Sequence, residues 1–90
     1  MELAEEVLRA LTNEYPTLLR EAGIGGNVQV WFFIDEEGVT RRTLINDSSG
    51  HLALDDAALR VADAVEFTPA LNGEKPVPVW ISLPITFTTR

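Results

Sequence analysis

The C-terminal part of the chain constrains the fold most, because apolar residues alternate there with other residues over a long stretch. The apolar set consists of Val77, Val79, Ile81, Leu83, Ile85 and Phe87. Strict alternation of this kind predicts a strand with one face in the core. Pro78 and Pro84 fall on the other set of positions. Since proline has no N–H to donate to a neighbouring strand, residues 77–87 are expected to form an edge strand.

Two further strands are expected earlier in the chain. Residues 27–34 alternate, with Val28, Val30, Phe32 and Ile34 on one face. Charged residues and a glycine follow at 35–38, which is typical of a hairpin turn. Residues 39–46 are then the returning strand of the hairpin.

Three helices are expected around these strands. Residues 2–12 repeat apolar side chains at helical spacing, and residues 54–65 do so more clearly. Pro16 suits the start of a short helix at 17–22, with Leu18 and Leu19 facing inward. Residues 47–51 and 71–76 have the composition of loops. This order of elements predicts an α+β domain, in which a small three-stranded antiparallel sheet carries helices on one face.

Composition excludes several classes of function. Fourteen acidic against seven basic residues give a net charge of −7, and this acidity argues against nucleic acid or an anionic membrane as a partner. The chain has no cysteine and one histidine, so we expect no cofactor, no metal site and no enzyme activity. The longest apolar run, at 30–34, is too short to cross a bilayer, and the acidic N-terminus does not resemble an export signal.

His51 and the aromatic residues of the first strand allow alternative interpretations. His51 lies near Asp47 and Asp55, but a loop that leads into a helix explains it better than acid–base catalysis. Trp31 and Phe33 lie on the face of the first strand opposite the core. We expect that second face to be covered, either by residues 2–12 or by a second copy of the chain.

Fragments spread from Tyr15 to Phe87 together resemble the C-terminal domain of the TonB family. Each fragment is weak alone, and the resemblance depends on their order and spacing. They are Tyr15-Pro16, residues 22–28, the hairpin at 35–38, residues 47–50, Leu54-Asp55, Ala58-Leu59, residues 67–70, Asn72-Gly73 and residues 75–80. The resemblance implies the same α+β fold. It also divides this single domain of residues 1–90 into an extra N-terminal helix at 1–14 and a core at 15–90.

The resemblance further implies a function in energy transduction. Members of this family are anchored in the inner membrane of Gram-negative bacteria and reach across the periplasm. They couple the proton-motive force to outer-membrane transporters by binding the TonB box, an extended transporter segment, as an added strand. The expected localisation is therefore periplasmic, as a fragment of an anchored protein. The expected alternative is an isolated module that forms a strand-paired homodimer with an assembly role.

The expected partner-binding residues lie on the last strand and at the Tyr-Pro motif. They are Tyr15, Pro16, Val77, Val79, Trp80 and Ser82. The motif Tyr15-Pro16 is interpreted either as a peptide contact or as a turn that redirects the chain. Trp80 is either a binding anchor or a residue packed under the N-terminal helix or in a dimer interface.

Overall fold

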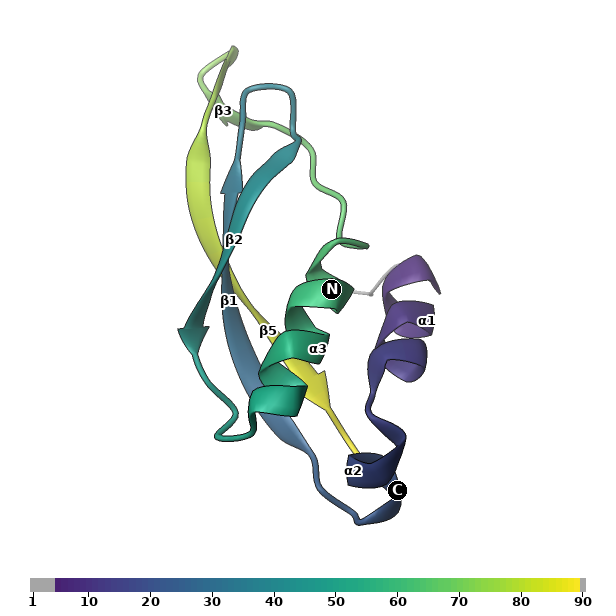
Figure 1. Ribbon diagram of the computed structural model, residues 1–90. Helices are drawn as coiled ribbons and strands as arrows, with labels where there is room; N and C mark the ends of the chain where they lie inside the picture. Colours follow the sequence, from purple (N-terminus) through teal and green to yellow (C-terminus); the bar gives the residue numbers. More distant parts are fainter. Residues whose placement is uncertain (1–4, 90) are drawn as a thin grey trace.

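A computed structural model describes residues 5–89 (Figure 1). In chain order its elements are α1 (Glu5–Glu14), α2 (Thr17–Glu21), β1 (Gly26–Ile34), β2 (Thr40–Asp47), α3 (Leu52–Ala62), β3 (Ala70–Asn72), β4 (Lys75–Val77) and β5 (Val79–Phe87). The expected α+β fold class is confirmed.

The main sheet has three antiparallel strands in the order β2-β1-β5, so β1 is central and β5 is at an edge, as expected. β1 and β2 form the expected hairpin. Its turn places Gly38 at φ +84°, and a Cβ there would come within 2.9 Å of the Phe67 carbonyl oxygen. Glycine is required at this position because other residues rarely adopt that backbone conformation.

The core lies between the sheet and α3. Alternate residues of β1 from Val28 to Ile34 are buried, and they meet buried residues of α3 such as Leu54 and Val61. The far end of β5 adds Ile85 and Phe87 to the same core. One face of the sheet is therefore covered by a helix, as the alternation predicted.

The N-terminal helix is present, but it does not cover the second face of the sheet. Figure 1 shows α1 beside α3, on the side of α3 away from the sheet. Val7 is buried there, and Arg60 of α3 donates to Glu14 of α1 at 2.5 Å. The expectation that residues 2–12 cover the aromatic face is therefore wrong for the described part of this helix.

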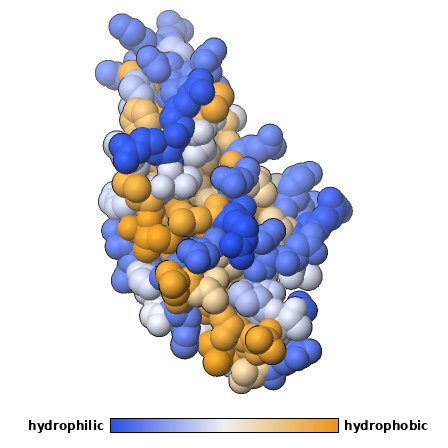
Figure 2. Space-filling model, viewed as in Figure 1, coloured by the Kyte–Doolittle hydropathy of each residue, from blue (hydrophilic) through white to orange (hydrophobic). Residues whose placement is uncertain are grey.

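Two local expectations also differ from the structure. Residues 71–76 are not only a loop, because β3 and β4 pair across Gly73-Glu74 as a short hairpin, and Pro78 separates β4 from β5. Leu18 does not face inward: it is 82% exposed, while Leu19 is half-buried against the core. Figure 2 shows an apolar patch at the lower end of the molecule, where Figure 1 places α2. Adjacent residues of a helix point about 100° apart, so α2 buries one leucine and exposes the other.

Candidate functional site: the open edge of the sheet

β5 offers one long edge that no other strand uses. Within residues 5–89, β5 pairs with β1 alone, in an unbroken register from Gly26–Phe87 to Ile34–Val79. None of its nine residues is charged. An edge of this kind presents backbone N–H and C=O groups that an added strand can pair with.

The hydrogen bonds of the hairpin show which residues of β5 face this open edge. Asp35 N–H donates to the Val39 carbonyl at 3.0 Å, so the backbone of Asp35 faces the returning chain. Successive residues of a strand direct their backbone groups to opposite sides, so odd-numbered residues of β1 face β2 and even-numbered ones face β5. In the observed register even residues of β1 oppose odd residues of β5. The backbone groups of Trp80 and Ser82 therefore face the open edge.

Four of the six expected partner-binding residues lie together at one end of this edge. Val79 and Ser82 are half-buried, Trp80 is 43% exposed, and Val77 is half-buried in the adjoining β4. Ser82 also links the three strands on the outer face, since its hydroxyl accepts from Asn46 at 3.1 Å and donates to Gln29 at 3.3 Å.

Tyr15 and Pro16 lie at the other end of β5. Tyr15 is buried, its ring meets Phe87 edge-on at 5.1 Å between centroids, and its hydroxyl donates to the Ile24 carbonyl at 2.5 Å. Phe87 is seven positions from Trp80, about 23 Å at roughly 3.3 Å per residue. The structure therefore places Tyr15 where it anchors the strand end, apart from the residues around Trp80.

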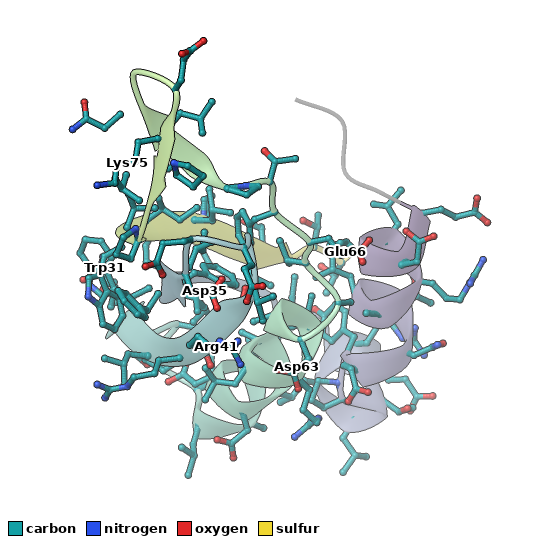
Figure 3. All side chains as sticks on the ribbon, turned by 90° about the horizontal axis from the view of Figure 1, so that it is seen from above. Trp31, Asp35, Arg41, Asp63, Glu66 and Lys75 are labelled. Carbon is teal, nitrogen blue, oxygen red and sulfur yellow. The ribbon has the colours of Figure 1, made fainter. Side chains whose placement is uncertain are left out.

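An aromatic cluster occupies the outer face of the sheet, opposite α3. The Trp80 ring lies 5.1 Å from Phe33 and 6.4 Å from Trp31, between centroids. Trp31, Leu44 and Trp80 line a shallow, open hollow of about 240 Å³. Figure 3 shows Trp31 on the side of the sheet away from α1. Trp80 thus packs within the sheet face, and the idea that it lies under the N-terminal helix is wrong.

Two residues of this cluster were not anticipated from the sequence. Arg42 holds its guanidinium 5.8 Å from the centre of the Trp80 ring, at cation–π distance, and Leu44 borders the hollow. Most residues of their strand, β2, are polar. The strand also contains an extra residue at Arg41, which interrupts the register between Phe33 and Ile34. Alternation alone therefore did not indicate which of its side chains share a face with Trp31.

The Asp35 carboxylate fixes the turn beside this end of the sheet. It accepts from the backbone N–H groups of Glu37 and Val39, both at 2.9 Å, and from Arg41 Nε at 2.6 Å (Figure 3). The hydrogen bond from Val39 and then that from Arg41 lower the pKa of Asp35 below its ordinary value of 3.8. The carboxylate stabilises a hairpin turn, and its contacts are not those of a ligand site.

Residues 48–51 form the loop that leads into α3, as expected for His51. The Asp55 carboxylate accepts from the Ser48 hydroxyl and from Ser49, whose N–H lies at 2.9 Å and hydroxyl at 2.8 Å. Burial raises the pKa of Asp55, but these hydrogen bonds outweigh it and lower the pKa below 3.8. His51 is exposed at the N-cap position, and its side chain makes no capping hydrogen bond.

Among residues 5–89, no three His, Asp or Glu side chains gather where they could hold a metal ion. None of the helices in that range is both long and apolar enough to span a bilayer.

Comparisons of this chain with known proteins agree on one family. Residues 12–89 match the family described as the C-terminal domain of the Gram-negative bacterial TonB protein. The chain is 35% identical over 74 residues to the TonB2 protein of Pseudomonas aeruginosa, covering 82% of this chain and 27% of that protein. It is 34% identical over 73 residues to the TonB protein of Vibrio cholerae, covering 81% and 30%. The chain thus spans less than a third of the length of either relative.

A solved structure supports the same assignment. The solution structure of the TonB C-terminal domain of Helicobacter pylori is similar with a TM-score of 0.65 and 25% identity, over 94% of this chain and 78% of that one. The sequence match and the shared arrangement of strands and helices agree: this chain belongs to the TonB C-terminal domain family.

Proposed function

We propose that this domain is the non-enzymatic, periplasmic partner-binding end of an energy transducer anchored in the inner membrane. It binds the TonB box, an extended segment of an outer-membrane transporter, and passes energy from the proton-motive force to that transporter. The observation that carries this proposal is the nine-residue strand β5, which has a partner on one side only among the described residues. Family membership supports it as well.

The chemistry of the edge fits an extended peptide. Main-chain hydrogen bonds provide most of the affinity in strand addition, and each contributes about 1 kcal/mol net. Trp80 adds an aromatic side chain at the edge, of the kind that often dominates binding energy. Val77 and Val79 lie at the start of the same edge. Tyr15 packs on Phe87 at the opposite end of β5, and Pro16 follows it at the start of α2.

A proline substitution tests this proposal. Ser82→Pro removes one N–H from the open edge, and Ser82→Ala removes the same hydroxyl but keeps the N–H. We expect Ser82→Pro to weaken TonB-box peptide binding about tenfold or more, and Ser82→Ala to change it by less than about threefold. Calorimetric titration measures both affinities, and circular dichroism verifies the fold. A folded Ser82→Pro protein that binds as tightly as the original would show that another surface is used.

A homodimer is the second candidate function, favoured by the exposed outer-face cluster around Trp80 and Leu44. In this case two copies pair through the β5 edge, and the chain has an assembly role. Sedimentation distinguishes the two candidates. A protein that stays monomeric at high micromolar concentration would exclude the dimer as the functional state.

A further inference from the structure

We propose that Pro78 and Pro84 restrict the open edge to a window at residues 79–83, so that its occupant is a short extended peptide with about five paired residues. This inference rests on the proposed function, because it assumes that β5 accepts an added strand. In this proposal the two prolines determine how long the paired part of the bound segment is and at which residues it pairs.

The position of a proline in the strand decides on which side of the strand its ring lies. Pro78 and Pro84 share the even-numbered positions of Trp80 and Ser82, whose backbone groups face the open edge. The register with β1 continues without interruption through Pro84, which lies opposite Gln29. A proline is tolerated within such a ladder when its nitrogen faces away from the neighbouring strand. The Pro84 ring is therefore on the side where a peptide would arrive.

The prolines remove backbone N–H groups that an added strand could otherwise use. On an edge strand without proline, every second residue offers both an N–H and a C=O to an added strand. Pro84 offers the C=O only and places its ring where the N–H would be, while Pro78 has no N–H to offer and lies at the break between β4 and β5. Between them Trp80 and Ser82 retain both groups, whereas Thr86 lies beyond Pro84. An added strand can exchange paired hydrogen bonds at these two positions and loses them on either side.

The window also specifies the chemistry of the bound side chains. Peptide residues opposite Trp80 and Ser82 lie on the outer face, next to the exposed edge of the aromatic cluster. The residue opposite Ile81 lies on the helix-covered face, next to side chains that are only half-buried at Val79, Ile81 and Leu83. A β-branched apolar residue is expected at that central position, because such residues pack well on a pleated sheet.

The same prolines argue against a second copy as the occupant. A long, uncharged edge strand is a template for pairing with itself, and natural proteins interrupt such edges with proline or charge. β5 has no charged residue, so Pro84 within it and Pro78 directly before it are the interruption. If two copies paired through β5, each would bring both prolines to the shared ladder. A short peptide meets them only at its ends.

Peptides of increasing length test this inference. We use a lysine-flanked series of alternating threonine and valine with three, five, seven or nine strand residues, titrated by calorimetry. The affinity of the original protein should rise up to about five residues and then level off. Pro84→Ala restores an N–H, so its affinity should keep rising to seven residues and should end roughly threefold to tenfold higher. Pro76→Ala removes an exposed proline in β4 and should follow the original protein.

The outcomes of these titrations distinguish the proline window from strand addition itself. If Pro84→Ala shows the same plateau and affinity as the original protein, while Ser82→Pro weakens binding, the window is refuted and the docking edge stands. If the original protein binds no peptide of the series at any length, strand addition and the window both fail. Self-association of Pro84→Ala, at concentrations where the original protein sediments as a monomer, would further support the window. A dimer of the original protein paired through β5 would overturn it.

Discussion

Single residues hold the ends of the open edge in place. Tyr15 joins the start of the family core to the last residue of β5 through its contact with Phe87, and to the loop before β1 through its hydrogen bond to Ile24. The sequence left two interpretations open for Tyr15, a turn or a peptide contact. Its burial against Phe87 adds a packing contact, which the neighbouring residues in the sequence could not reveal because Phe87 is distant along the chain. The peptide contact stays a prediction.

Asp55 is the residue for which we predict a pH-dependent contribution to stability. Its pKa is lowered in the folded protein, so its stabilisation is present above about pH 4 and is lost as the pH falls through the folded pKa. Asp55→Asn should lower the free energy of unfolding by about 1 to 3 kcal/mol at pH 7 and by much less at pH 2.5. Urea denaturation at both pH values measures this.

Asp56 provides the matched control, because it is the adjacent carboxylate on α3 and is exposed. Asp56→Asn should change the free energy of unfolding by less than about 0.5 kcal/mol at either pH. An Asp55→Asn deficit that is equal at pH 7 and pH 2.5 would contradict the role assigned to its hydrogen bonds with Ser48 and Ser49.

At the scale of the elements, α1 stabilises the domain through α3 and takes no part in the sheet. Val7→Ala removes two methyl groups from a buried position and should cost about 1 to 2 kcal/mol of unfolding free energy. Leu8 is half-exposed, so Leu8→Ala should cost less than about 0.5 kcal/mol. Neither change should alter peptide affinity. A Val7→Ala protein of unchanged stability but weaker binding would instead place α1 at the binding edge.

The elements also show what sequence reasoning can and cannot predict. Alternation over residues 27–34 and 77–87 predicted β1 and β5, and the prolines placed β5 at the edge, because these signals are local. The β3–β4 hairpin was missed, since three-residue strands give too short a pattern. The position of α1 was also not predictable: its apolar face fits either side of the sheet, and the choice depends on α3.

At the scale of the whole molecule, charge is separated from the open edge. The net charge is −7, yet β1 and β5 carry no charged residue, and the acidic side chains of residues 5–89 lie on helices, turns and loops, apart from Asp47 at the end of β2. The surrounding negative potential favours a partner segment with flanking positive charge, whereas the edge itself selects for backbone pairing. The chain thus combines an acidic surface with a neutral edge strand.

Amide hydrogen exchange across the whole domain, measured by NMR with and without the nine-residue peptide, tests the central claim most directly. Without peptide, the amides of Trp80 and Ser82 should exchange fast, while those of Ile81 and Leu83 should be protected by bonding to β1. With peptide bound, Trp80 and Ser82 should become protected. Protection that appears instead at Thr43 and Ile45 on the β2 edge, or nowhere on β5, would contradict the account.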